Sequence, residues 1–426
     1  MKKIFTNGVF DLFHEGHLNL LKKAKNEGDY LLVGVASDES CSKYKRVPFM
    51  SWEERAKKIK ELPFVDEVIE TLWSRDLNED FYIKNQISLQ VQGDEGSGFA
   101  LAKKMGILKV VGTTEGISTT KLLNILNAES IEIFEHGYLN DVKRVLFEDK
   151  YYVIKQGNRT VARKYPIPLP DDRIKIEFDV ISSFRNLIEK PDFIIKPICT
   201  DHKNLIIFDC APIVSETLFE KLLKEKKPNE ELFVSIIKDL ALLHSSTYDN
   251  QELRSRFENN NGFLKIKIGI QCLDATKEPE LNGFISRFIS ESLKIKKVLL
   301  HGDFAPKNIL VWNNNYLFID FEESGFADPA LDVGYFLAHL YIHQIICSEP
   351  SWRGTISNLL DVYLKAFKFS HNDSQLINRI EKYMGIFLMS RINSKAPANY
   401  ISVLYKDVIL NTGRKLILED FLHSFD

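Results

Sequence analysis

Apolar and polar positions follow two different rhythms along the chain. Up to residue 70, apolar runs at 4–9, 30–36 and 65–69 alternate with stretches at 18–26 and 52–62 that have the apolar spacing of helices. A further predicted strand, at 89–92, leads into a glycine-rich turn, and a helical pattern at 119–127 closes this part. Alternating strands and helices are typical of βαβ units, so we predict a parallel sheet flanked by helices.

The rhythm changes near residue 131. Apolar runs at 142–147, 151–155 and 205–208 come first, and long helical patterns dominate after residue 218. Strands followed by helices indicate a separate α+β domain. We therefore predict one domain at 1–130 and a second at 131–426, the latter with an N-terminal lobe at about 131–212 and a C-terminal lobe at about 213–426.

Composition narrows the class of protein. The 426 residues are enough for two or three domains, and a formal net charge of −3 without a dense basic face argues against nucleic acid as the main partner. The five cysteines lie far apart and are expected to be reduced thiols. No apolar run approaches about 18 residues, and the N-terminus lacks a signal-peptide core. We expect a cytoplasmic enzyme that acts on small molecules and does not insert into a membrane.

A first cluster of candidate catalytic residues follows the first predicted strand. His14, Gly16 and His17 occupy a turn and the start of a helix. Gly16 lets the backbone approach a ligand closely, and the free N–H groups of a helix start attract phosphate. Two imidazoles three residues apart can donate protons to the same polyphosphate, so we assign catalysis to His14 and His17.

A second phosphate-binding feature lies where Ser118 is a natural N-cap for the helix at 119–127. Lys43, Lys45 and Arg46 could add positive charge from a loop. The chemistry would be attack of an anionic oxygen on an α-phosphorus with pyrophosphate leaving, helped by positioning and charge neutralisation. Each feature alone has a plainer interpretation, such as a cap, half a metal site or a solvated loop. Their joint occurrence in this order favours an active site.

Residues 8–17 and 114–120 together resemble the two signature motifs of the cytidylyltransferases, closest to those that use glycerol 3-phosphate. The resemblance covers about residues 1–127. It implies a Rossmann-like fold of the HxGH nucleotidyltransferase type, CTP as the nucleotide, and leaves open a homodimer through this domain. It also implies nucleotide contacts, which together with the loop lysines are Gly8, Phe10, Gly16, Lys43, Lys45, Arg55, Gly93, Asp94, Ile117, Ser118 and Thr119.

Two features keep an alternative nucleotide open. Thr113 stands where the family usually has an arginine that contacts phosphate. The segments at 6–11 and 33–40 also resemble the adenylyltransferase half of bacterial heptose-activating enzymes, which use ATP. CTP is our prediction, with ATP as the alternative.

A second cluster lies in the C-terminal half. Asp303 and Asn308 are five residues apart in a loop beside a short strand, and a second strand leads to Asp320 and Glu322. Phosphoryl transfer needs a carboxylate to orient the acceptor hydroxyl, together with oxygen ligands that hold Mg²⁺ against the phosphates. We assign the first role to Asp303 and the metal to Asn308, Asp320 and Glu322.

This pattern resembles the aminoglycoside phosphotransferase and choline/ethanolamine kinase superfamily, which has the protein-kinase fold. The resemblance implies that Lys155 binds the ATP phosphates, that Glu177 pairs with it, and that residues 137–142 form the turn over the phosphates. That turn is poor in glycine, and Lys155 could instead be an exposed strand lysine. Asp332, in the trailing DPxxD element, is expected to be structural.

The two resemblances imply a bifunctional enzyme with ATP and CTP as substrates and Mg²⁺ as cofactor. The kinase would phosphorylate a small alcohol, and the transferase would convert the phosphate to a CDP-linked product for surface polysaccharide or phospholipid-type decoration. The alternatives are an adenylyltransferase fused to a sugar kinase, and a regulatory nucleotide-binding protein with one inactive domain. Trp352, Tyr363 and Phe367 could form a cage for a quaternary amine, although their helical spacing favours the core.

Overall fold

The structure of the chain is a computed structural model in which residues 1–44, 47–94, 97–114, 117–134, 140–157, 170, 172–201, 203–260, 262–276, 278–394, 397–398 and 400–419 are described. It forms two compact units. The first comprises residues 1–133, 143–155 and 198–208, and the second comprises residues 134–142, 156–197 and 209–426. The domain boundary expected at residue 130 remains a prediction.

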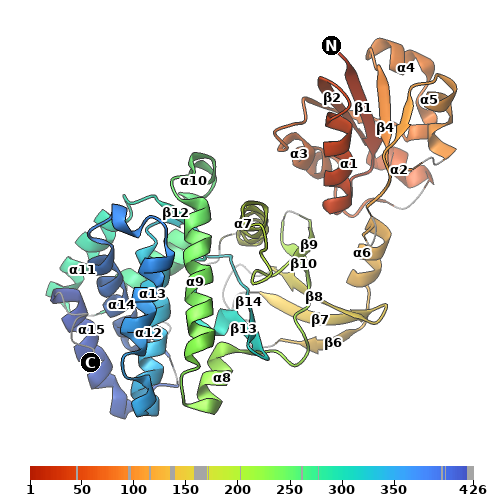
Figure 1. Cartoon of the computed structure of the whole chain (residues 1–426). Helices are drawn as coiled ribbons and strands as arrows, with labels where there is room; N and C mark the ends of the chain where they lie inside the picture. Colours follow the sequence, from red (N-terminus) through yellow and green to blue (C-terminus); the bar gives the residue numbers. More distant parts are fainter. Residues whose placement is uncertain are drawn as a thin grey trace. The chain divides into compact units, whose positions relative to one another are not determined.

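The first part of the chain builds two sheets (Figure 1). Its elements are, in order, β1 (Lys3–Gly8), α1 (Glu15–Lys25), β2 (Tyr30–Ala36), α2 (Asp38–Tyr44), α3 (Trp52–Lys60), β3 (Glu67–Thr71), α4 (Glu79–Lys84), β4 (Leu89–Gln92), α5 (Ala100–Lys104), β5 (Leu108–Val110), α6 (Thr119–Leu126), β6 (Ser130–Ile133), β7 (Asp141–Phe147), β8 (Lys150–Gln156), β9 (Pro197–Thr200) and β10 (Leu205–Asp209).

The N-terminal sheet is parallel and has helices on both faces. Its strand order is β3-β2-β1-β4-β5, and β1 pairs with β2 from Lys3 opposite Tyr30 to Gly8 opposite Val35. Neighbouring strand residues point to opposite faces, so Ile4 joins the cluster under α1 and α3 while Phe5 joins the one under α4 and α5. The predicted Rossmann-like fold is confirmed. Strand β3 begins at Glu67 instead of residue 65.

A second sheet has the order β6-β7-β8-β10-β9. Apolar side chains of its strands form a cluster with α6 that includes Ile125, Ile154 and Ile207. Leu12, from the loop between β1 and α1, is fully buried in the same cluster. This loop carries His14. It follows β1 of the first sheet and packs through Leu12 against the second sheet and α6, all within the first unit.

The second unit is mainly helical, as the sequence predicts for a kinase-like C-terminal lobe. Its elements are α7 (Arg173–Leu187), β11 (Glu216–Thr217), α8 (Leu218–Glu225), α9 (Glu230–Thr247), α10 (Gln251–Phe257), a π-helix (Phe263–Leu273), α11 (Pro279–Ser292), β12 (Val298–Leu299), β13 (Ile309–Trp312), β14 (Asn315–Phe318), β15 (Phe326–Ala327), α12 (Ala330–Cys347), α13 (Thr355–Ala366), α14 (Leu376–Asn393) and α15 (Val403–Leu418).

A tight hairpin delivers the acidic residues that follow β14. Strands β13 and β14 pair antiparallel from Ile309 opposite Phe318 to Trp312 opposite Asn315. Asn313 and Asn314 between them have φ of 45° and 63°, the left-handed values of a two-residue hairpin turn that asparagine tolerates well. The turn fixes the register of β14 and hence the position of Asp320.

Within the described residues, one helix is long and apolar enough to cross a bilayer. It is α12, and 78% of the helix is buried inside the fold, as in the core helix of a soluble protein. No apolar run of this length was expected from the sequence, because Asp332 and His339 interrupt the apolar residues of α12. All five cysteines are free, which agrees with the expected thiols.

Candidate functional site

The loop between β1 and α1 has a strained backbone. Phe10 and Leu12 have φ of 57° and 46°, values that non-glycine residues rarely adopt. Both side chains are buried, which offsets the cost of this conformation. Strain of this kind clusters at functional sites, and here it turns the chain so that His14 reaches the start of α1.

His14 and His17 form one unit at that helix start. His14 is the N-cap of α1, and its Nδ1 accepts a hydrogen bond from the N–H of Gly16 at 3.1 Å. The two rings stack with centroids 3.8 Å apart. In the described part of the chain, Nε2 of His14 and Nδ1 of His17 are buried and have no hydrogen-bond partner. These two nitrogens are available to a ligand.

Burial keeps both imidazoles uncharged at neutral pH. It lowers the pKa of His14 to about 4. It also holds the pKa of His17 well below the usual value, and the neighbouring His14 adds to this effect. A bound polyphosphate would favour the protonated rings, because an opposite charge nearby raises the pKa of a histidine. The pair can therefore take up protons as an anionic ligand arrives.

The glycines predicted at this site are required by packing. A Cβ on Gly16 would lie 2.9 Å from Cε1 of His14, and one on Gly8 would lie 3.1 Å from the ring of Phe10. Both distances are too short for ordinary contact. Larger residues would displace the ring that each glycine faces.

The N-terminus of α6 meets this loop. Ser118 is its N-cap and accepts a hydrogen bond from the N–H of Lys121 at 3.2 Å, as the sequence predicts. Thr119 Oγ1 donates to the backbone carbonyl of Asp11 at 3.2 Å. The side chain of Ile117 lies beside Gly16. The structure therefore brings together His14, His17 and the two helix starts that were expected to bind phosphate.

A small pocket opens next to these helix starts. It is lined by Val9, Asp11, Cys41, Pro48, Trp73, Thr119 and Thr120. Asp11 shapes one side, because its buried carboxylate accepts hydrogen bonds from the N–H groups of Phe49 and Met50 at 2.9 and 3.0 Å. The pocket thus adjoins the histidine loop, the middle of α2 and the start of α6.

Arg55 lies beneath the loop and is fully buried. Its guanidinium donates to the carbonyls of Met50, Val9 and Ala36 at 3.1, 2.5 and 2.9 Å, and it pairs with Asp38. These contacts make Arg55 a brace between the loop, β2 and α3. Its predicted contact with the nucleotide stays a prediction.

The remaining predicted nucleotide contacts are less connected to the histidines. Lys43 is more than half exposed and pairs with Glu39 at 3.2 Å. Gly93 and Asp94 follow β4, and a Cβ on Gly93 would lie 3.2 Å from the side chain of Thr113. Lys45 lies outside the described residues. The roles of these residues stay predictions.

In the second unit, Asp303 is buried among cations. Its Oδ1 lies 2.6 Å from Nζ of Lys267, and its Oδ2 lies 2.8 Å from Nζ of Lys307. Burial alone would raise the pKa of Asp303, but the two ammonium groups outweigh it and hold that pKa well below the usual range. Asn308 Nδ2 donates to the carboxylate and to the carbonyl of Asp303, both at 2.8 Å. Asp303 is thus a fixed, ionised carboxylate, and its predicted role toward the acceptor hydroxyl stays a prediction.

The loop that carries Asp303 is held from behind by Asp332. The buried carboxylate of Asp332 accepts hydrogen bonds from the N–H groups of His301 and Gly302 at 2.7 and 3.0 Å. Gly302 has φ of 89°, and a Cβ there would overlap the carbonyl of Glu323. The structural role expected for Asp332 agrees with these contacts.

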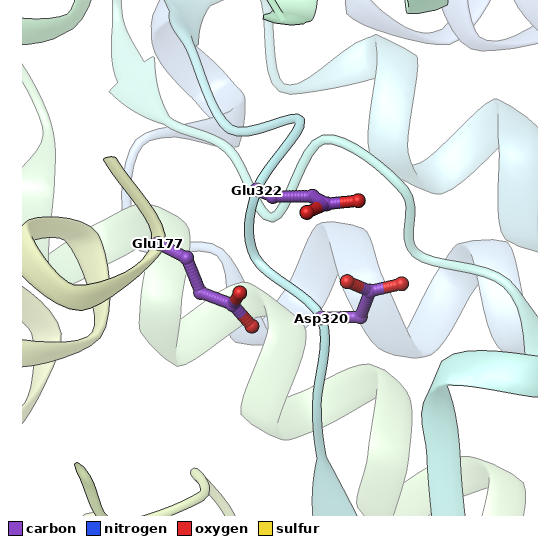
Figure 2. Close-up of side chains that lie close together, drawn as sticks. All are labelled: Glu177, Asp320 and Glu322. Carbon is purple, nitrogen blue, oxygen red and sulfur yellow. The ribbon is translucent and has the colours of Figure 1, made fainter. Parts of the chain in front are cut away.

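Three carboxylates converge beside this loop (Figure 2). Glu177 projects from α7, and Asp320 and Glu322 project from the segment after β14. One oxygen of each lies within 4.8 Å of the other two. Oxygen ligands of this kind suit Mg²⁺, so the donor set fits the expected metal. Glu177 was expected to pair with Lys155, and the structure places its carboxylate in this cluster.

Two further residues shape the carboxylate cluster and were not assigned roles from the sequence. Asn140 Nδ2 donates to Glu322 at 2.7 Å, and Arg173 donates to Asn140 at 3.0 Å. Arg173 is also 3.9 Å from Glu322 and is almost fully buried. Asn140 belongs to the predicted covering turn at 137–142, of which residues 137–139 are outside the described residues, and Arg173 is the first residue of α7.

Lys155 is on β8 in the first unit, whereas Glu177 is in the second, so the ion pair predicted between them stays a prediction. Lys155 is only 6% exposed, which excludes the alternative of an exposed strand lysine. Trp352, Tyr363 and Phe367 are at most 2% exposed and belong to the core. They do not form a cage for an amine.

Comparisons with known proteins match two parts of the chain to two families. Residues 5–125 match the cytidylyltransferase-like family, and residues 130–356 match the phosphotransferase enzyme family. Glycerol-3-phosphate cytidylyltransferase of Bacillus subtilis (strain 168) is 39% identical over 124 residues, covering 29% of this chain and 95% of that protein. Ethanolamine-phosphate cytidylyltransferase of Dictyostelium discoideum is 37% identical over 128 residues, covering 28% of this chain and 35% of that protein.

Among solved structures, the amicoumacin kinase hAmiN in complex with AMP-PNP, Ca²⁺ and Ami has a TM-score of 0.48 at 11% identity, covering 72% of this chain and 96% of that chain. The chain therefore belongs to the cytidylyltransferase-like family through its N-terminal part, and to the phosphotransferase enzyme family through the longer part that follows.

Proposed function

We propose that the chain phosphorylates a small alcohol with ATP and then condenses the alcohol phosphate with CTP, releasing pyrophosphate. One observation carries the proposal. A region similar to nearly the full length of a glycerol-3-phosphate cytidylyltransferase shares a chain with a phosphotransferase-family region. The product of the second region would be the substrate of the first, so the two activities form consecutive steps.

In the kinase step, Asp303 would accept a hydrogen bond from the alcohol and direct its oxygen at the γ-phosphorus of ATP. The new oxygen–phosphorus bond forms as the bond to the β–γ bridging oxygen breaks, and ADP leaves. Because Lys267 and Lys307 keep the pKa of Asp303 low, its main task is orientation, with the proton transferred late. Mg²⁺ held by Glu177, Asp320, Glu322 and Asn308 would neutralise phosphate charge, and Lys155 would contact the ATP phosphates.

In the transferase step, a phosphate oxygen of the alcohol phosphate would attack the α-phosphorus of CTP as pyrophosphate leaves. His14 and His17 would donate hydrogen bonds from their available nitrogens to the phosphates. The starts of α1 and α6 would add backbone N–H groups and the Thr119 hydroxyl. These groups stabilise charge that develops on the leaving group.

We further propose a cytosolic enzyme whose partners are nucleotides and a small alcohol, either a monomer or a homodimer through the N-terminal part. A CDP-activated alcohol would serve surface polysaccharide or phospholipid-type decoration.

A single panel tests the proposal. Purified chain is incubated with ATP, CTP and each of several alcohols, and products are identified by mass spectrometry. We expect ADP, pyrophosphate and a CDP-linked alcohol, and a higher kcat/KM for CTP than for ATP in the transferase step. Equal or greater kcat/KM with ATP would favour the adenylyltransferase alternative. Absence of ADP or of pyrophosphate with every alcohol would favour a regulatory protein with an inactive domain.

A further inference from the structure

We propose that Lys267, Tyr335, His339 and Arg391 form the recognition site for the acceptor alcohol, and that this site selects an oxygen-rich alcohol, a polyol or a hydroxy acid, against a cationic one. The inference rests on the proposed kinase function. It names the substrate class for the site around Asp303.

The position proposed for the acceptor site follows from the position of Asp303. A carboxylate that orients the acceptor hydroxyl must touch the acceptor, so the groups around it also face the acceptor. Lys267 is completely buried, 2.6 Å from Asp303 and 3.4 Å from Glu323. Its ammonium group also lies 3.8 Å from the centre of the Tyr335 ring. The guanidinium of Arg391 lies over the same ring at 5.7 Å.

The element that carries Lys267 points independently to function. Residues 263–273 form a π-helix eleven residues long, a rare conformation that occurs mostly as single turns inside α-helices and is frequent at functional sites. The wider turn brings Lys267 to Asp303, 36 residues further along the chain. For this mainly apolar segment, a regular α-helix would have the lower conformational free energy.

Buried polar atoms without partners mark the place of a ligand. His339 is 6% exposed, and neither of its ring nitrogens has a hydrogen-bond partner among the described residues. The same holds for Nε of Arg391 and the hydroxyl of Tyr400. His339 packs edge-on against Tyr335, with ring centroids 4.8 Å apart. Such atoms are costly to bury unless a ligand or water satisfies them, and hydroxyl and carboxylate oxygens can do so.

The charge of the cluster decides between alcohols. Lys267 and Lys307 lie 2.6 and 2.8 Å from Asp303, and Arg391 adds a third cation over Tyr335, against the two carboxylates of Asp303 and Glu323. The site therefore has an excess of positive charge. The face of Tyr335, which could otherwise attract an amine, is already occupied by the protein's own cations. A quaternary or primary amine would meet repulsion and no free aromatic face.

The test measures ADP formation with glycerol, ribitol and glycerate against choline and ethanolamine. We expect kcat/KM to be at least about tenfold higher for an oxygen-rich alcohol. Arg391→Met should lower this value about 10- to 100-fold, as expected for loss of a hydrogen bond from a charged group, and leave the KM for ATP unchanged. Arg391→Glu should shift the preference toward the amines. The matched control is Arg414→Met, on α15, whose guanidinium pairs with Glu278 at 2.5 Å and is partly exposed.

The outcomes separate this inference from the proposed function. ADP formed with choline or ethanolamine at equal or higher kcat/KM would overturn the inference and leave the kinase function intact. Unchanged acceptor kcat/KM in Arg391→Met would overturn the assignment of Arg391. No ADP with any of the five alcohols would overturn the kinase function and the inference with it. If Arg391→Glu fails to fold, the wild-type panel and Arg391→Met still decide.

Discussion

Arg55→Ala removes the brace beneath the histidine loop. The side chain is fully buried, and its guanidinium donates to three backbone carbonyls, those of Val9, Ala36 and Met50. The variant removes the guanidinium donor from all three acceptors and opens a cavity, while the Ala36 carbonyl keeps the Cys41 thiol as a weak donor at 3.8 Å. Because the loop carries His14, we expect both the stability of the N-terminal part and the transferase rate to fall.

The size of the loss follows from the contacts. A buried acceptor deprived of its partner costs about 1–3 kcal/mol. Water entering the cavity will partly satisfy the three carbonyls, so we take the lower end for each and expect a loss of about 3 kcal/mol. The ion pair with Asp38 adds little, because that carboxylate is 40% exposed. Arg55→Lys, which keeps a charge but fewer donors, should lose less.

Hydrogen–deuterium exchange of the full chain is the assay, since it reports local opening in a protein with several units. Peptides covering β1 and α3 should exchange faster in Arg55→Ala. The control is Lys109→Ala, which removes one half-exposed ion pair with Glu27 and should cost under about 1 kcal/mol. An opening free energy changed by less than about 1 kcal/mol in Arg55→Ala, with a raised KM for CTP, would refute the brace and favour a direct nucleotide contact.

Three further predictions concern the two sites. His14→Ala or His17→Ala should slow pyrophosphate release about 10²–10⁴-fold, the range for a positioned proton donor, without affecting ADP formation; unchanged release in the double variant would contradict the assignment. Asp303→Asn and Asp320→Asn should each abolish alcohol phosphorylation, while added alcohol phosphate still yields the CDP-linked product by mass spectrometry. Folded His14 has its pKa lowered to about 4 from 6.5, so the unfolded chain binds the extra proton between these values and stability should fall as pH drops through them. Urea unfolding at pH 7 and pH 5 should show a smaller fall for His14→Gln, and an equal fall would exclude His14 as the cause.

Much of the fold could be predicted because short strand-like segments alternate with helical apolar spacing along the first part of the chain. Strands β2 and β4 have the predicted bounds, since polar residues or glycine flank each run. Strand β3 starts two residues late because Val65 still belongs to the turn after α3, where its N–H donates to the carbonyl of Leu62. The spacing of apolar residues in the sequence does not reveal this turn.

The site residues that could be predicted stand in short, recognisable local patterns. His14 and His17 share one helix turn, and Asn308 follows Asp303 by five residues. Lys267 reaches Asp303, and Arg391 reaches the ring of Tyr335, through tertiary packing, which no local spacing reports. One signal was present for Lys267: a lysine inside a mainly apolar run must be paired if the run is buried.

The apolar cluster around Leu12 has a genetic consequence. Leu12 belongs to the histidine loop, and the same cluster contains Ile154 and Ile207, which the chain reaches more than a hundred residues later. The backbone of His14 also forms a bridge with Cys199 of β9. Substitutions at these late positions should therefore show epistasis with substitutions in the histidine loop. Sequence changes would then occur together in residues 5–125 and in strands β7 to β10, although these belong to two different family regions. An exchange of the transferase region between related chains would have to include strands β7 to β10.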